Sequence, residues 1–350
     1  MKNEKTLTVL IPLLALILGL LAGAVIISLM GASPIAAARY LLMGAFGSVS
    51  NFGFTLVKAT PLIFTSLCAC FAYRCGIMNL GGEGQFIIGS VVAVWVATDW
   101  GIEGWPVTLL ALVLGLAAGA LWAAIPAILK IKRRLNEMIV SIMLNYVATL
   151  FMGWVYTSLL RDGYIPQTFA VPDQTKLIRP FAGMHVTYGF FIAILVAVLI
   201  HYYLFYTYSG FKLRAVGLNQ TASFYNGFPV QKLMMFSFIV SGAIAGLGGA
   251  CEVLGTQYRL QNGYARGFGF DGVAIALIAQ LNPLYAVIVA YFFAVLRAGA
   301  TTMQVGTGIP TSVVDIIQAI VIVAAVAGLA VTHLPQIQRY FQSVQKEGEQ

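Results

Sequence analysis

Charge is scarce in this chain. Only 9% of its 350 residues are Asp, Glu, Lys or Arg, while 60% are hydrophobic, and a typical globular domain carries roughly 25% charged residues. A water-soluble fold needs more charge than this to cover its surface. The composition therefore excludes a soluble protein and predicts an all-α, polytopic bundle of transmembrane helices.

Residues that carry common enzyme chemistry are also few. The three histidines, His185, His201 and His333, lie in different segments and assemble no metal cluster. The sequence has no Gly-x-x-x-x-Gly-Lys-Ser/Thr phosphate loop, and its Gly-x-Gly-x-x-Gly at 267–272 lacks a βαβ context. Four cysteines fall in or beside apolar stretches and imply no disulfide or metal site: Cys68, Cys70, Cys75 and Cys251. We expect no catalytic residue, metal or cofactor on this chain.

Ten apolar segments recur along the chain at lengths near those of membrane spans. They are residues 7–30, 55–73, 85–97, 105–129, 138–160, 186–206, 233–254, 272–281, 284–302 and 313–331. The first is longer than the roughly 7 to 15 apolar residues of a signal peptide, so we expect an uncleaved span. Segments 85–97 and 272–281 are short and can be tilted, broken or re-entrant. The chain reads as one transmembrane domain, 1–350, with a tail at 333–350.

The placement of the basic residues orients this domain. With the N-terminus in the cytoplasm, twelve Lys and Arg residues fall in inner segments and six in outer ones. An excess of inner positive charge predicts a plasma-membrane protein with both termini cytoplasmic. The net charge of +8 is explained by this topology, so we expect no nucleic-acid partner.

Polar groups within the apolar segments are candidates for function. A charged side chain at the centre of a span costs about 2.5 to 3.5 kcal/mol on insertion scales, so such residues should face protein or water. They are Lys58, Glu83, Glu252, Asp271, Arg297 and Asp315. They can line a polar path or merely fix helix packing. Asn79, Glu83 and Gln85, set among glycines, are hard to explain by packing alone.

Other glycines have a simpler interpretation. Pairs spaced four apart let helix backbones approach closely and indicate a packed bundle. They are Gly19 with Gly23, Gly115 with Gly119, and Gly242 with Gly246.

The inner segment 208–232 predicts a contact with another protein. Asn219 is an N-cap residue, residues 220–225 can form a short helix, and Gly227 can end it. The nearby Phe224, Tyr225 and Phe228 would be exposed unless something covered them. A cytoplasmic partner is the first interpretation, and packing onto the protein's own inner face is the second.

Four ordered motifs resemble the permease subunits of bacterial ABC importers in the branched-chain amino acid, ribose and nucleoside class. Gly76-Ile-Met-Asn-Leu-Gly-Gly-Glu-Gly-Gln85 is similar to the signature Gly-x-x-Asn-Ile-Gly-x-Glu-Gly-Gln of that class, and 135–146 to its Asn-Glu-x-Ile-x-x-x-Met-Leu-Asn-Tyr stretch. Residues 213–219 resemble its cytoplasmic coupling loop, and 267–277 its later Gly-Phe-x-Gly-Ile-Ala-Val-Ala-Leu element. Ser223 and Asn226 depart from the usual alanines.

The resemblance implies a bundle like that of type II ABC importers, in which the ten apolar segments would be the spans. It implies a permease, paired with a second permease subunit as a homo- or heterodimer, that docks through 208–232 on an ATP-binding subunit. That partner would use the ATP, and a binding lipoprotein or periplasmic protein would deliver solute. The form of the first motif and the outer segment 163–172 are most similar to the nucleoside or simple-sugar branch. Nucleosides are the leading solutes, with ribose, other simple sugars and branched-chain amino acids as alternatives.

Two sets of residues follow from the motifs. The translocation path, or the polar contacts that shape it, is expected to include Asn79, Glu83, Gln85, Asn136, Glu137, Asn145 and Asp271. The contact with the ATPase is expected to include Leu213, Arg214, Ala215, Val216, Gly217, Asn219, Phe224, Tyr225 and Phe228. An ion-coupled secondary transporter that uses Glu83, Glu252, Asp271 and Asp315 is the alternative mechanism.

Overall fold

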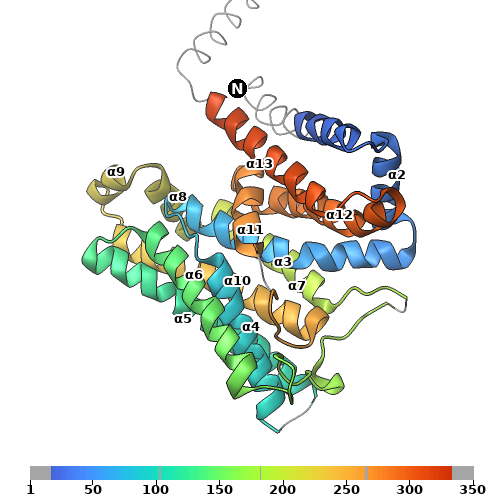
Figure 1. Cartoon of the computed structure of the whole chain (residues 1–350). Helices are drawn as coiled ribbons and strands as arrows, with labels where there is room; N and C mark the ends of the chain where they lie inside the picture. The colour runs from blue at the N-terminus through green and yellow to red at the C-terminus, as the bar shows by residue number, and fades with distance from the viewer. Residues whose placement is uncertain (1–16, 102–103, 182, 265–266, 333–350) are drawn as a thin grey trace, which may run out of the picture. The chain divides into compact units, whose positions relative to one another are not determined.

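The computed structural model describes residues 17–101, 104–181, 183–264 and 267–332 (Figure 1). Within these ranges every regular element is a helix, and β-pairing is confined to two isolated bridges, Arg161 with Thr168 and Gln167 with Gln261. The expected all-α class is confirmed for this part of the chain. The expected tail, 333–350, lies outside it. The chain divides into two compact units, Met1–Gly47 with Val295–Gln350, and Ser48–Ala294.

The first unit begins with a sharply bent pair of helices. The helix Ile17–Leu29 turns by 116° into α2 (Pro34–Phe46). The Ser33 side chain accepts from Ala36 N, and Pro34 suits the first helical position because its missing N–H needs no partner there. The sequence predicts one span over 7–30 and no further span before residue 55. Residues 7–16 lie outside the described ranges, and α2 is a helix that the sequence analysis missed.

Two further helices complete the first unit, and close backbone approaches hold it together. They are the C-terminal part of α12 (Pro283–Thr307) and α13 (Ser312–Thr332). A Cβ on Gly19 would lie 2.2 Å from Val321, and one on Gly23 would lie 2.7 Å from Ile317 of α13. The predicted small-residue pair therefore seats the first helix on α13.

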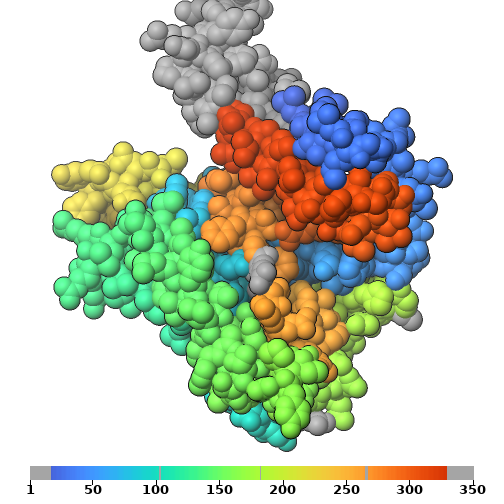
Figure 2. All heavy atoms as spheres, viewed as in Figure 1, coloured from blue at the N-terminus to red at the C-terminus, as the bar shows by residue number. Residues whose placement is uncertain are grey.

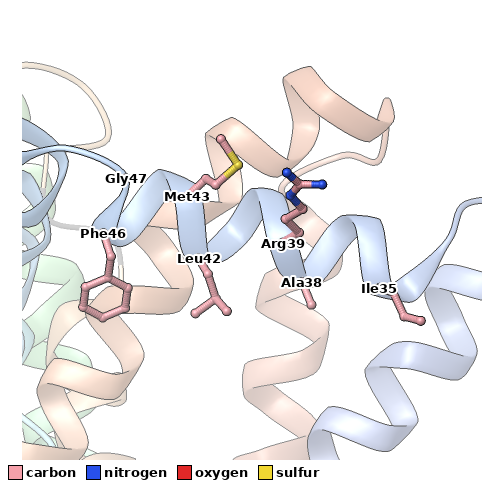
Figure 3. Close-up of a pocket in the computed structure, with 7 residues that line it drawn as sticks. All are labelled: Ile35, Ala38, Arg39, Leu42, Met43, Phe46 and Gly47. Atoms are coloured by element: carbon pink, nitrogen blue, oxygen red, sulfur yellow. The ribbon is translucent and has the colours of Figure 1, made fainter.

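One face of α2 carries an open hollow of about 500 Å³. Its lining comes from α2 and the following glycine: Ile35, Ala38, Arg39, Leu42, Met43, Phe46 and Gly47 (Figure 3). Arg39 is the only charged side chain among them. A hollow this apolar offers few hydrogen-bonding groups to a polar solute, so we place no solute site there.

The second unit contains most of the helices. They are α3 (Val49–Arg74), α4 (Gly82–Asp99), α5 (Trp105–Arg133), α6 (Glu137–Trp154), α7 (Tyr188–Tyr206), α8 (Tyr208–Leu218), α9 (Gln220–Tyr225), α10 (Val230–Glu252), α11 (Phe268–Ile278) and the start of α12 (Figure 1). Single π-helical turns, Val155–Leu159 and Val253–Gln257, follow α6 and α10, and a 3₁₀ turn spans Asp173–Thr175.

The core of this unit is built on α3 and α10. Helix α10 packs against α3, α4 and α5. In the most apolar stretch of α3, 83% of residues are buried, against 28% in α5, α6 and α7, so the latter three keep broad apolar faces that suit lipid. A Cβ on Gly246 would lie 2.5 Å from Gly115 O, and one on Gly119 would lie 2.3 Å from Gly242 O. The predicted close packing of these glycines is confirmed.

The expected count of ten spans is not confirmed. Among the described residues, six helices are long and apolar enough to cross a membrane, or seven if the bent pair is one span. Helix α11 has 11 residues, a length of about 16 Å against a hydrocarbon core of ~30 Å. It is therefore a half-length element.

Candidate functional site

A pair of buried amides closes the polar loop between α3 and α4. Asn79 Nδ2 donates to Gln85 Oε1 at 3.0 Å, and Gln85 Nε2 donates back to Asn79 Oδ1 at 3.1 Å. Asn79 Nδ2 also donates to Ser241 Oγ of α10 at 2.8 Å. Both amide side chains are 1% exposed. Because a buried polar group without a partner is costly, these bonds fix the loop against α10.

A second amide holds the first turn of α4. Asn145 of α6 accepts from Gly84 N through Oδ1 and donates to Leu80 O through Nδ2, both at 2.8 Å. A Cβ on Gly84 would lie 2.9 Å from that Oδ1 atom, so the glycine makes room for the contact. Asn145 thereby joins α6 to the start of α4.

Glu83 caps the half-length helix α11. Its Oε1 accepts from Gly267 N and its Oε2 from Gly269 N, each at 2.7 Å. These N–H groups belong to the open end of α11, where a carboxylate is favoured by unpaired donors and by the helix dipole. A Cβ on Gly269 would lie 2.3 Å from Glu83 N, so only glycine allows this approach.

Of the other residues predicted for the path, Asn136 and Glu137 lie apart from this cluster, whereas Asp271 lies on the turn of α11 that Glu83 caps. Asn136 Oδ1 accepts from Met138 N at 2.9 Å and caps α6, while Glu137 Oε2 lies 2.7 Å from Lys130 Nζ of α5. Asp271 lies in the first turn of α11 and is half-buried. Asn79, Glu83, Gln85 and Asn145 therefore gather around the start of α4, and Asn136 and Glu137 join α5 to α6.

The segment predicted to contact a partner folds as expected. Asn219 Oδ1 accepts from Ala222 N at 2.9 Å, α9 spans Gln220–Tyr225, and Gly227 has φ +78°. Phe224 is 68% exposed and Tyr225 83%, while Phe228 packs edge-on against Phe211 of α8 at 6.4 Å between ring centroids. Figure 2 shows this segment, in yellow, standing out from the second unit. Leu213 and Val216 of α8, both predicted to contact the ATPase, are instead fully buried, so they anchor the segment and present no surface to a partner.

A basic and aromatic hollow of about 630 Å³ lies beside α9. Its charged lining comes from Lys130 and Arg134 at the end of α5 and from Lys232 at the start of α10, and its aromatic lining includes Phe224, Tyr225 and Phe228. The same end of the unit therefore carries both exposed rings and positive charge. This combination suits a protein partner with apolar and acidic groups.

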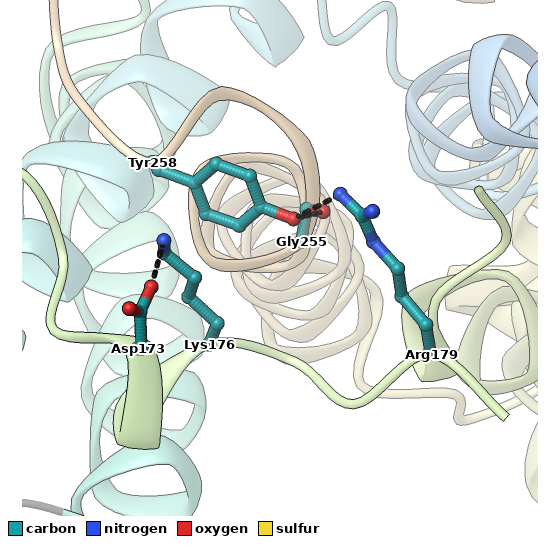
Figure 4. A network of polar contacts seen from close by, with 5 residues as sticks. All are labelled: Asp173, Lys176, Arg179, Gly255 and Tyr258. Atoms are coloured by element: carbon teal, nitrogen blue, oxygen red, sulfur yellow. Dashed lines mark hydrogen bonds and ion pairs between the residues drawn. The ribbon is translucent and has the colours of Figure 1, made fainter.

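The segment after α6 is held at the other end of α10. Thr168 N donates to Leu260 O at 3.1 Å, and Val171 N donates to Tyr258 O at 2.9 Å. The Tyr258 ring lies 4.5 Å from Lys176 Nζ, and its hydroxyl accepts from Arg179 Nη2 at 2.9 Å (Figure 4). These contacts join residues 168–179 and 258–260 into one surface.

A charge pair lies on that surface. Asp173 binds Lys176 (Figure 4), and the hydrogen bond and charge of Lys176 hold the pKa of the Asp173 carboxyl below its ordinary value. Asp173 therefore stays ionised at neutral pH. The cations around Tyr258 are Lys176 and Arg179, and the ion pair balances one of them.

The helical bundle, with a polar buried loop and a capped helix projecting from one end, defines a multi-pass membrane protein. Over residues 51–326 the chain matches the family described as branched-chain amino acid transport system / permease component, and it belongs to that family.

Related proteins have names that fit this family. The guanosine ABC transporter permease protein NupP of Bacillus subtilis is 39% identical over 328 residues, 92% of this chain and 94% of that protein. The nucleoside ABC transporter permease protein NupB of Lactococcus lactis is 33% identical, covering 91% of each chain. The glucose ABC transporter permease protein TsgB13 of Haloferax volcanii is 32% identical, covering 89% and 85%. No solved structure matches this chain.

Three residues that the fold brings to these sites are not among those predicted from the sequence. Ser241 completes the amide cluster, Tyr258 organises the surface after α10, and Arg74 bonds the turn after α11. Arg74 could have been identified from the sequence, because it is a charged residue at the end of a long apolar segment. Ser241 and Tyr258 could not have been identified from a local sequence pattern, since their partners lie 162 and 79 residues away along the chain.

Proposed function

We propose that this chain is the permease subunit of an ATP-driven importer and that it carries nucleosides across the bacterial plasma membrane. The observation that carries this proposal is α9, a short capped helix with two exposed rings at a basic end of a membrane bundle in the permease family. A lone helix of six residues is marginal in water. Its exposed Phe224 and Tyr225 fit a groove on a separate ATP-binding subunit.

The remaining parts of the complex follow from this assignment. The ATP-binding subunit binds and hydrolyses ATP, a second permease subunit completes the channel, and an extracytoplasmic binding protein delivers solute. The end that carries α9 faces the cytoplasm, as do both termini. The surface around Tyr258 then faces outward, toward the binding protein. Nucleic acid has no part in this complex.

Nucleosides are proposed as solutes because two of the named relatives carry "guanosine" or "nucleoside" in their names. One relative carries "glucose", which keeps simple sugars as the alternative. The melting temperature of the cognate binding protein, measured with nucleosides, ribose, glucose and leucine, separates these cases. A shift with sugars alone would reject nucleosides.

The polar cluster around α4 shapes the translocation path in this proposal. Its side chains, Asn79, Glu83, Gln85 and Asn145, bond one another, backbone groups and Ser241. We propose that they act by fixing the starts of α4 and α11 beside the path. Asp271 lies on the first turn of α11, where it can meet the path directly. Asn136 and Glu137 fix the connection between α5 and α6.

Removing the exposed rings of α9 tests the docking role. Phe224→Ala with Tyr225→Ala should lower co-purification of the ATP-binding subunit and ATP-driven uptake by about tenfold or more, because aromatic anchors dominate interfaces. Tyr164→Ala is the matched control for co-purification, since Tyr164 is 97% exposed but lies in the segment after α6, at the other end of α10. Normal assembly of the double variant would contradict the proposal.

Reconstitution tests the energy source. Proteoliposomes that contain both permeases and the ATP-binding subunit should import nucleoside only with ATP and binding protein. Uptake by this chain alone, abolished by an ionophore, would instead support the ion-coupled alternative through Glu83, Glu252, Asp271 and Asp315.

A further inference from the structure

The arginine that ends α3 bonds the turn after α11. Arg74 Nε donates to Leu281 O and Arg74 Nη2 to Gln280 O, both at 2.9 Å. Gln280 and Leu281 have φ of +53° and +57°, a left-handed conformation that side chains other than glycine adopt only when their surroundings impose it. A guanidinium with two donors in a fixed fork holds both carbonyls at once. Arg74 therefore fixes the turn through which α11 continues into α12.

The same guanidinium and one from α8 both lie over the ring of Phe205. Arg74 Cζ lies 5.4 Å from the centroid of the Phe205 ring, and Arg214 Cζ lies 5.0 Å from it. Two cations share the ring of Phe205, which lies near the end of α7. Arg214 Nε is buried and has no hydrogen-bond partner among the described residues. The Phe205 ring thus lies between the guanidinium groups of α3 and α8 and gives them a shared contact.

Backbone contact reinforces this link. A Cβ on Gly217 of α8 would lie 2.1 Å from Arg74 O and 3.0 Å from Gly76 N. Helix α8 thus lies directly on the junction between α3 and the polar loop. Packed backbones that leave no room for a methyl group transmit displacement because they cannot be compressed.

Helix α11 is held by charge at both ends. Glu83 accepts from Gly267 N and Gly269 N at its start, and Arg74 donates to the two carbonyls after its end. Each charge has the sign that the helix dipole favours at that end. Helix α11 also packs along α3. A half-length helix fixed in this way can shift as one body when its two clamps shift.

We propose that Arg74 is a positioning residue that passes movement of α8 and α9 to α11, and so couples ATP hydrolysis to the solute path. This rests on the proposed docking of the ATP-binding subunit on α9. When that subunit pulls α9, α8 moves with it, and the contacts of Gly217 and Phe205 carry the displacement to Arg74. Arg74 then moves the end of α11.

The test measures solute imported per ATP hydrolysed in proteoliposomes with the full complex. Arg74→Gln should assemble with the ATP-binding subunit and keep its basal hydrolysis, while the ratio falls by about tenfold. Arg74→Lys keeps the charge but cannot bond both carbonyls in a fork, so its ratio should fall between those of Arg74→Gln and the unmodified protein. Arg39→Gln, at an exposed arginine of α2 that belongs to neither proposed partner surface, is the control and should keep the normal ratio.

The ratio of solute imported to ATP hydrolysed distinguishes a coupling defect from a structural one. A merely structural defect lowers assembly, hydrolysis and uptake together. A normal ratio in Arg74→Gln overturns the inference. If Arg74→Gln does not assemble, Arg74→Lys and Phe205→Leu decide: a reduced ratio in either supports the role, and a normal ratio in both overturns it. Failure of the unmodified permease to bind the ATP-binding subunit would instead reject the proposed function.

Discussion

The polar side chains of the predicted path make different hydrogen bonds in the structure. Asn79 and Gln85 bond each other, Asn145 bonds the backbone of α4, and Glu83 caps α11. Each is the kind of intramembrane polar group that suggests a solute contact. Each instead has protein partners, and the bond to Ser241 extends the cluster into α10. These hydrogen bonds therefore favour a structural role for the four side chains, in which they hold α4, α6, α10 and α11 together.

A substitution at Asn79 tests the structural role. Asn79→Leu removes the amide partner of Gln85 and the acceptor of Gly81 N, and it leaves buried polar groups unpaired, so it should destabilise the protein by about 2 to 4 kcal/mol. Ser241→Ala removes a single acceptor and should cost about 1 kcal/mol. Thermal unfolding in detergent measures both. A direct solute contact would instead raise the KM for uptake in Asn79→Leu with no loss of thermal stability.

At the scale of elements, glycines determine which helices of the second unit pack in direct backbone contact. Helices α4, α5 and α10 approach so closely that a Cβ on Gly89 would lie 2.3 Å from Gly246 O, and one on Gly249 would lie 2.0 Å from Phe86 O. Such contacts compensate for the weak hydrophobic drive between helices in lipid. They hold the helix α4 that carries Glu83, and hence the start of α11.

Alanine at one of these glycines should be costly. Gly246→Ala places a methyl group 2.5 Å from Gly115 O, a backbone atom that cannot move away, and should destabilise the bundle by about 2 kcal/mol. Gly153→Ala is the matched control in α6, where the nearest atom is Tyr156 Oη at 3.8 Å. It should be neutral or stabilising, because alanine favours helix over glycine. Equal melting temperatures for the two variants would contradict this packing.

At the scale of the molecule, the orientation proposed for the chain decides which surfaces meet which partners. Helix α9 and its basic hollow must face the ATP-binding subunit, and the surface around Tyr258 must face outward. The native cysteines offer a clean background for labelling, because Cys68, Cys70, Cys75 and Cys251 are all buried.

Cysteine labelling tests that orientation. Tyr164→Cys, at a residue 97% exposed, should react with a membrane-impermeant maleimide on intact cells. Leu218→Cys, at a residue 89% exposed next to α9, should react only in inside-out vesicles. The unmodified protein supplies the control for background labelling. The reverse pattern would overturn the positive-inside assignment.

The sequence alone determined the class of the molecule and its local elements. Scarce charge required a membrane bundle, and Asn219 and Gly227 bounded α9, because composition and capping act over a few residues. Apolar length alone did not reveal the short helix α2, and the expected ten spans are not confirmed. Only the tertiary structure decided the partners of Glu83, Arg74 and Asn145. Hydrogen bonds between residues 61 to 207 positions apart follow from helix packing, which no local pattern encodes.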